Sequence, residues 1–98
     1  MQVIYKPRAS GKTLEVIKMS AEKDYYIVCQ NRKECSRIFH IAQELGLNMP
    51  FPVSFDEFLE KRYCGRHIKG FIIDNADMLL QYLAQAPIKC ITLTKEVD

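Results

Sequence analysis

Short apolar runs alternate along this chain with segments in which hydrophobic residues recur every three or four positions. Runs rich in β-branched and aromatic residues predict four strands, at 2–5, 25–29, 71–73 and 88–94. Helical periodicity between these runs predicts four helices, at 13–23, 32–45, 55–63 and 78–86.

Capping residues support three of these helices. Asn31 with Glu34, and Ser54 with Glu57, have the spacing of a capping box, in which the first side chain accepts from the backbone of the third helical residue. Asp77 is expected to cap the last predicted helix. These polar residues therefore fix where the predicted helices begin.

The alternation of strands and helices indicates the fold class. Strand–helix–strand units favour right-handed crossovers and a parallel sheet that is covered on both faces. We therefore expect one α/β domain over residues 1–98, with three layers and a mostly parallel, four-stranded sheet. In sheets of this kind ligands bind outside the carboxyl ends of the strands.

One segment between a predicted strand and a predicted helix has the composition of an anion-binding loop. Residues 6–13 read KPRASGKT, and phosphate-binding loops have the form GxxxxGK[ST] in this structural context, although Lys6 replaces the first glycine here. A glycine lets backbone amides approach an anion, and the helix that follows adds its positive dipole end. The predicted nucleotide-binding residues are Arg8, Ala9, Ser10, Gly11, Lys12 and Thr13. The alternative is a solvated turn that begins a helix.

A second segment supplies a carboxylate at the same edge of the predicted sheet. The apolar run 71–73 ends at Asp74, so the strand would present this side chain rigidly at its carboxyl end. A carboxylate and a hydroxyl are ligands that Mg²⁺ accepts beside the phosphates of a nucleotide. Asp74 and the hydroxyl of Thr13 are therefore the predicted metal ligands.

The two segments resemble the Walker A and Walker B motifs of P-loop NTPases, on the helicase and phage terminase side of that superfamily. Arg8-x-x-Gly11-Lys12-Thr13 is similar to the arginine-bearing Walker A of terminase large subunits, and residues 74–77 are similar to the DEAD-type motif of helicases. The segments at 27–32 and 91–94 look like further strand-end motifs of helicases. The resemblance implies a P-loop, helicase-like sheet and a site for ATP, or another nucleoside triphosphate, with Mg²⁺.

The chain departs from this family at the position of the catalytic base. Asn75 stands where helicases have a glutamate, and an amide orients water but does not accept its proton. Asp77, Glu57 and Glu60 are carboxylates that could substitute, although none of them lies at the family's position. An arginine that reaches the terminal phosphate is expected from a protein partner or from self-association. We therefore predict weak or no hydrolysis by the chain alone, as in an accessory or regulatory protein, with an origin in a phage as a further expectation.

Composition limits the other classes of function. The chain has 98 residues and a net charge of +2, which gives no polybasic signal for nucleic acid. A small basic cluster at 61–67, with Tyr63, leaves a nucleic-acid contact open, whereas we interpret Arg32, Lys33 and Arg37 as a solvated helix face. No apolar run is long enough to cross a membrane, and no signal segment is evident.

The cysteines indicate a reducing compartment. Cys29, Cys35, Cys64 and Cys90 form no CxxC pair, so we expect buried, reduced thiols and a cytoplasmic protein, in the host cell if a phage encodes it. Two alternatives to a nucleotide-binding protein of weak activity remain at this point. One is a degenerate P-loop fold that binds protein or nucleic acid without nucleotide, and the other is an ATPase that a partner or self-assembly completes.

Overall fold

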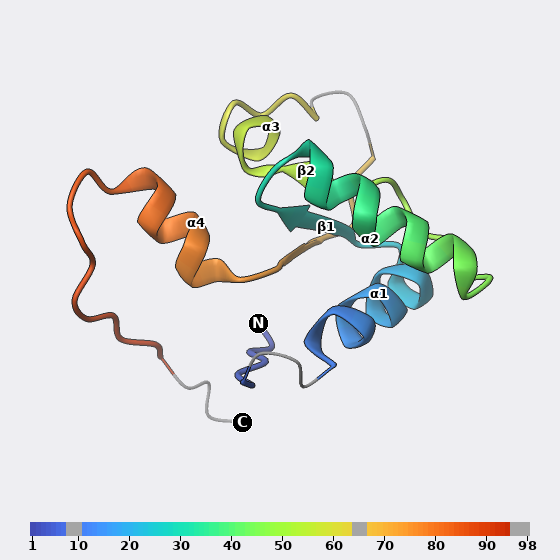
Figure 1. Ribbon diagram of the computed structural model, residues 1–98, viewed down its shortest axis with the longest axis horizontal. Coiled ribbons are helices and arrows are strands. Elements are labelled where there is room, and N and C mark those ends of the chain that lie inside the picture. Colours follow the sequence, from blue (N-terminus) through green and yellow to red (C-terminus); the bar gives the residue numbers. More distant parts are fainter. Residues whose placement is uncertain (8–10, 64–66, 95–98) are drawn as a thin grey trace.

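A three-stranded parallel sheet forms the centre of the protein. The computed structural model describes residues 1–7, 11–63 and 67–94. The strands β1 (Tyr26–Cys29), β2 (Val53–Ser54) and β3 (Phe71–Ile73) lie in the order β2-β1-β3 (Figure 1). The helices are α1 (Lys12–Lys23), α2 (Arg32–Glu44), α3 (Phe55–Leu59) and α4 (Ala76–Leu83).

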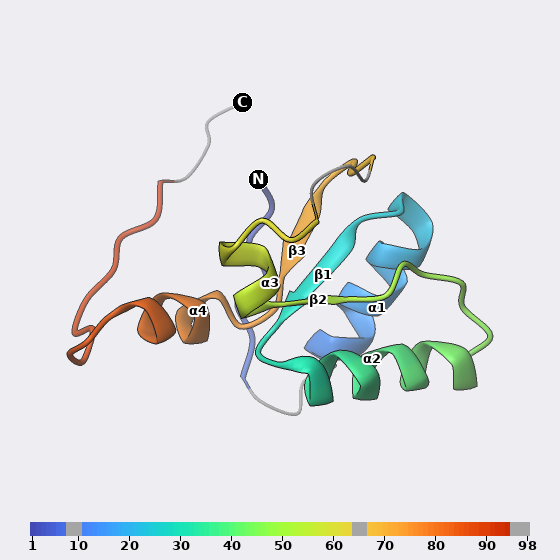
Figure 2. The ribbon, with the colours of Figure 1, turned by 90° about the horizontal axis from the view of Figure 1, so that it is seen from above.

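Successive side chains of the central strand β1 enter two separate cores. Ile27 and Cys29 pack in a cluster with residues of α1 and α2, whereas Val28 packs with Phe55 and Leu79, from α3 and α4. This is the alternation that a strand buried on both faces requires. Helices therefore cover both faces of the sheet, with α1 and α2 on one side and α3 and α4 on the other (Figures 1 and 2). The parallel α/β architecture expected from the sequence is confirmed.

Two of the predicted helix starts are confirmed. The Asn31 side chain accepts from the backbone N–H of Glu34 at 2.9 Å, at the beginning of α2. At the beginning of α3, Ser54 and Glu57 bond each other's backbone N–H reciprocally, both at 3.2 Å. These bonds satisfy amides that have no partner within the helix.

Two other helix boundaries differ from the prediction. The third helix ends at Leu59 rather than near residue 63, and Lys61 has a φ of 56°, a left-handed conformation that a helix does not continue through. The last helix begins at Ala76, after Asn75 with a φ of 55°, so Asp77 lies in its first turn and is not the cap.

The strands predicted at the two ends of the chain are not confirmed, and one short strand in the middle was not predicted. Residues 2–5 and 88–94 have no strand pairing in the structure, and the sheet of the described residues has three strands, not four. The third strand is the short β2, in which Val53 pairs with Val28 of β1. β3 is an edge strand with Ile73 38% exposed, and not the fully buried strand that its composition indicated.

Candidate functional site

The first turn of α1 presents backbone amides without a side-chain cap. Gly11 is the residue before the helix and has φ 84° and ψ 14°, which only glycine adopts without strain. A Cβ at this position would meet no atom within 4 Å, so the backbone conformation and not lack of space requires glycine. The first bond of the helix runs from the Glu15 N–H to the Gly11 carbonyl at 3.1 Å. The amides of residues 12–14 precede it and have no carbonyl partner within the helix.

The side chain that follows this glycine reaches the carboxyl end of β3. Lys12 Nζ donates to Asn75 Oδ1 at 3.2 Å, which joins two segments 63 residues apart in the sequence. The neighbouring Asp74 is fixed in the sheet, because its backbone N–H donates to the Val28 carbonyl at 3.0 Å. The N-terminus of α1 and the end of β3 therefore lie next to each other.

Asp74 is the buried charge of this site. The residue is 8% exposed, and burial raises the pKa of its carboxyl, while the positive charges of Lys12 and Arg37 lower the same pKa in part. The raised pKa means that burial disfavours the ionised form of this carboxyl, and a cation beside it would relieve the cost.

A cavity of about 460 Å³ extends from the start of α1 along α2. It is lined by Gly11, Lys12, Thr13, Leu14, Arg37, Ile41 and Leu45. Arg37 therefore faces the same space as Lys12, while its Nε donates to Glu34 Oε1 at 3.0 Å and its Nη2 pairs with the same oxygen. Its guanidinium is held in place and still half exposed.

The structure places the predicted site residues unequally. Gly11, Lys12, Asp74 and Asn75 meet at the carboxyl end of β3, and Thr13 lines the adjoining cavity. Residues 8–10 of the predicted loop lie outside the described residues.

The alternative carboxylates have other partners or positions. Asp77 lies in the first turn of α4, and its charge raises the pKa of Asp74. Glu57 forms part of the cap of α3. Burial opposes ionisation of its carboxyl, but the hydrogen bonds with Ser54 favour ionisation, and the pKa of Glu57 is lowered as a result. Glu57 is therefore an ionised structural group, which is poorly suited to accept a proton.

Lys6, at the position of the missing first glycine, pairs with α1. Its Nζ lies 2.6 Å from Glu15 Oε2 in the first turn of the helix. The lysine therefore fastens the N-terminal segment beside the helix start.

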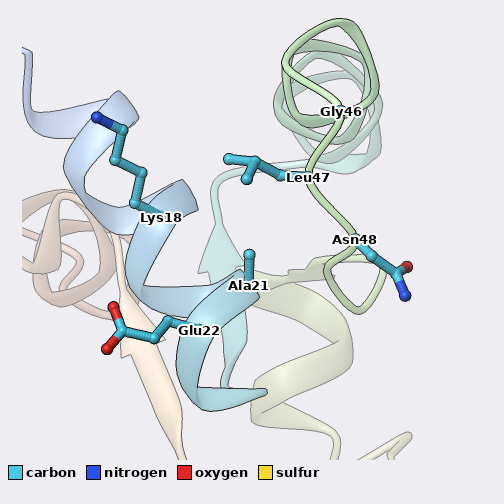
Figure 3. Close-up of a pocket in the computed structure, with 6 residues that line it drawn as sticks. All are labelled: Lys18, Ala21, Glu22, Gly46, Leu47 and Asn48. Atoms are coloured by element: carbon cyan, nitrogen blue, oxygen red, sulfur yellow. The ribbon is translucent and has the colours of Figure 1, made fainter.

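A second hollow, of about 520 Å³, lies between α1 and the loop that follows α2 (Figure 3). Ala21 and Leu47 point across it, whereas the charged ends of Lys18 and Glu22 point away from each other and from Leu47. Polar groups that converge on a ligand are typical of a binding site, and this hollow lacks them among the described residues.

In the basic cluster near residue 63, the aromatic ring packs against the core. The Tyr63 ring packs against Phe58 and Phe71, with centroids 6.1 and 5.1 Å away, so the ring belongs to the side of the core. Arg62 pairs with Glu60 at 2.5 Å. The ring of Tyr63 and the guanidinium of Arg62 therefore already have partners within the chain.

The cysteines agree with the sequence only in part. Cys29 and Cys35 are buried free thiols as expected, Cys90 is exposed, and Cys64 lies outside the described residues. Within the described ranges no group of three or more histidine, cysteine or carboxylate side chains could hold a metal ion by itself. None of the helices in these ranges is long and apolar enough to span a bilayer.

Comparison with known proteins adds no relative. No family model, curated protein or solved structure matches this chain.

Proposed function

We propose that this protein binds the phosphate chain of a nucleoside triphosphate, with Mg²⁺, at the N-terminus of α1. The observation that carries the proposal is the contact of Lys12 with Asn75 beside the buried Asp74. It joins the glycine–lysine–threonine segment to the strand-end carboxylate, although neither the spacing along the chain nor a local pattern requires the two to meet.

The site offers two kinds of group to a phosphate. The uncapped amides of the first turn of α1 and its dipole favour an anion there. Lys12 and Arg37 add positive side chains that line one cavity with Thr13. In the bound state Lys12 would exchange its neutral partner Asn75 for a phosphate oxygen, which is the stronger acceptor.

The residues fit a magnesium ion that a nucleotide brings with it. Mg²⁺ keeps several waters and is usually held by one or two carboxylates plus phosphate oxygens, so the lack of a dedicated cage in the described residues agrees with this mode. Asp74 would supply the carboxylate and Thr13 the hydroxyl. The ion would neutralise charge on the phosphates and on Asp74, whose burial Lys12 and Arg37 offset only in part.

Hydrolysis is expected to be slow in this arrangement. Asn75 is held by Lys12 and has no basic group, so it can orient a water and not deprotonate it. Arg37 is a cation of the chain itself that lines the cavity, which lessens the need for an arginine from a partner. We propose ATP as the nucleotide, on the resemblance to helicases, and an accessory role rather than that of a dedicated ATPase.

The proposal includes a fourth strand for the sheet. β3 pairs only with β1 among the described residues, and Ile4 already packs against the cluster between the sheet and α1 and α2. Residues 2–5 on the outer edge of β3 would make the four-stranded parallel sheet of a P-loop protein and would lead directly into the loop before α1.

Thermal unfolding with Mg-ATP, Mg-GTP and Mg-ADP tests the proposal. A ligand at 100 times its dissociation constant adds about 2.7 kcal/mol to the free energy of unfolding. Lys12→Ala should abolish this gain and leave the melting temperature without nucleotide nearly unchanged, because the hydrogen bond that its side chain makes with Asn75 lies at the surface. Lys18→Ala, an exposed position on the same helix, should retain the gain.

Two results would overturn the assignment. Equal stabilisation of the Lys12→Ala and Lys18→Ala variants would place the nucleotide elsewhere. No stabilisation of the unaltered protein by any of the three nucleotides would leave the fold as a binding module without nucleotide.

A further inference from the structure

Two buried thiols meet where β1 ends and α2 begins. Cys29 is the last residue of β1, and Cys35 is the fourth residue of α2. Their Sγ atoms lie 3.1 Å apart, and the residues are 1% and 0% exposed. Bonded sulfurs in a disulfide lie about 2.05 Å apart, so an approach of roughly 1 Å would close the bond.

We propose that Cys29 and Cys35 form a reversible disulfide by exchange with a small-molecule disulfide such as oxidised glutathione. The Cys35 thiolate attacks one sulfur of glutathione disulfide, which releases one glutathione thiolate and leaves a mixed disulfide on Cys35. Cys29 then loses its proton and attacks the Cys35 sulfur, and the second glutathione leaves as a thiol. The protein loses two protons and two electrons, which is two hydrogen atoms in all, and one glutathione disulfide becomes two glutathione thiols.

The surroundings of the pair distinguish the roles of its two members. With the Cys29 thiol as the donor, the hydrogen bond between the two sulfurs would stabilise a thiolate on Cys35 and lower the pKa of Cys35, although burial opposes this. Cys35 also lies near the N-terminal end of α2, where the helix dipole favours an anion. Cys29 has a raised pKa, because it is the donor in that hydrogen bond, is buried and lies near the negative charges of Asp74 and Glu34. Cys35 is therefore the attacking thiol and Cys29 the one that completes the bond.

Access to the pair requires only a local opening. Residues 30–33, which connect the two elements, are exposed, and α2 begins with the single cap bond from Asn31. Helix ends open at much lower free energy than the whole fold, so the first turn of α2 can admit a small disulfide without global unfolding. The closed bond would tie β1 to α2 beside Asp74. This inference does not depend on the phosphate site.

Equilibration of the full chain in glutathione redox buffers tests the proposal. Samples are quenched in acid, free thiols are alkylated, and peptide mass spectrometry identifies each disulfide. Folded protein should contain the Cys29–Cys35 bond, with the mass of two hydrogen atoms lost. Because the fold holds the two sulfurs together, the equilibrium constant for oxidation of the pair in folded protein should exceed that of the same pair in denaturant by at least about tenfold. By linkage, oxidation should raise the folding equilibrium constant by the same factor.

Matched variants separate this pair from the other cysteines. Cys90→Ser should leave the oxidation of the pair unchanged, since Cys90 is exposed and distant in sequence. Cys29→Ser should leave only glutathione adducts on the remaining thiols. An equal constant in folded and denatured protein would overturn the proposal, and so would disulfides that join either partner to Cys64 or Cys90. The comparison in the unaltered chain remains decisive if Cys29→Ser does not fold.

Discussion

Asp74 keeps a carboxyl group at 8% exposure, and this burial has a measurable cost for its ionised form. Its pKa is raised by burial above the ordinary value of 3.8, so the folded protein holds this proton to higher pH than the unfolded chain does. The carboxyl's contribution to stability therefore falls as the pH rises through the window above 3.8 and stays unfavourable at neutral pH.

Asp74→Asn should therefore stabilise the protein without nucleotide. The free energy of unfolding at pH 7 should rise by about 1 kcal/mol, which is typical of substitutions that remove an unfavourable functional group from a site. Urea unfolding at a series of pH values measures it, and the two proteins should converge in stability at acid pH. The order should reverse with Mg-ATP, because the variant loses the metal ligand. A variant less stable than the unaltered protein at pH 7 would show that Asp74 already has a favourable partner.

Asn75 combines an unusual backbone with the position of a missing base. Its φ of 55° costs a non-glycine residue roughly 1–2 kcal/mol, less for asparagine than for most. Turnover of Mg-ATP by the isolated chain should lie well below the roughly 1–100 s⁻¹ of dedicated phosphoryl-transfer enzymes. Asn75→Glu should raise it at least about tenfold, since a positioned base contributes on the order of 10²–10⁴ and an ion pair with Lys12 would hold part of this back.

Asn75→Gly is the matched control for this measurement. Glycine tolerates the same backbone conformation and supplies no base, so the variant should bind nucleotide and turn it over no faster than the unaltered protein. Brisk turnover by the unaltered chain would instead identify another carboxylate, with Asp77 the nearest along the chain, as the base. An equal rate in all three proteins would place the limit elsewhere, in the cations or in closure of the site.

Local pattern reveals some residues of the candidate site and not others. Gly11 and Lys12 stand out in the sequence because a glycine before a helix and a lysine after it form a short motif, and Asp74 stands out because it ends an apolar run. The position of Arg37 depends on how α2 packs against α1. In the structure Ile41, one turn further along α2, lines the same cavity as Arg37. A charged helix face and a site-facing arginine have the same sequence signature.

At the scale of elements, the capping box that begins α3 joins a strand to a helix. Ser54 ends β2 and caps the five-residue α3, so its hydroxyl fixes the turn that aims Phe55 into the core. Ser54→Ala should lower the free energy of unfolding by about 1 kcal/mol, through loss of the bond to the Glu57 amide. Ser36→Ala, at an exposed position within α2, should change it by less than about 0.5 kcal/mol. Urea unfolding compares the two, and equal small effects would mean that the cap adds nothing to stability.

Helices were predictable here and strands less so, for a physical reason. The periodicity that predicts α1 and α2 is a local property of the sequence. α1 begins one residue earlier than predicted, and α2 ends one residue earlier than predicted. A strand depends on a partner elsewhere in the chain. Residues 88–94 have strand-like composition and no partner strand in the structure, whereas two residues, Val53 and Ser54, pair because β1 lies beside them.

At the scale of the whole molecule, β3 is an edge strand of the sheet among the described residues, and its outer edge is where a further strand would pair. Backbone bonds from Tyr26 N–H to the Gly70 carbonyl and from Asp74 N–H to the Val28 carbonyl, both 3.0 Å, show which residues of β3 face β1. Because successive residues of a strand point their backbone groups to opposite sides, Phe71 and Ile73 face the outer edge. The proposed fourth strand would pair with those two residues.

Amide hydrogen exchange of the full chain distinguishes three strands from four. If residues 2–5 pair with β3, the Ile73 amide should be protected to within about tenfold of the Asp74 amide, and amides within 3–5 should share that protection. The position of Ile4 against the core and the Lys6–Glu15 pair, 2.6 Å apart, already hold this segment near the site. Residues 90–94, exposed and without strand pairing, should exchange almost as fast as an unfolded chain. Fast exchange at Ile73 with slow exchange at Asp74 would mean that the sheet ends at β3, and that the loop before Gly11 is not held by a strand of its own.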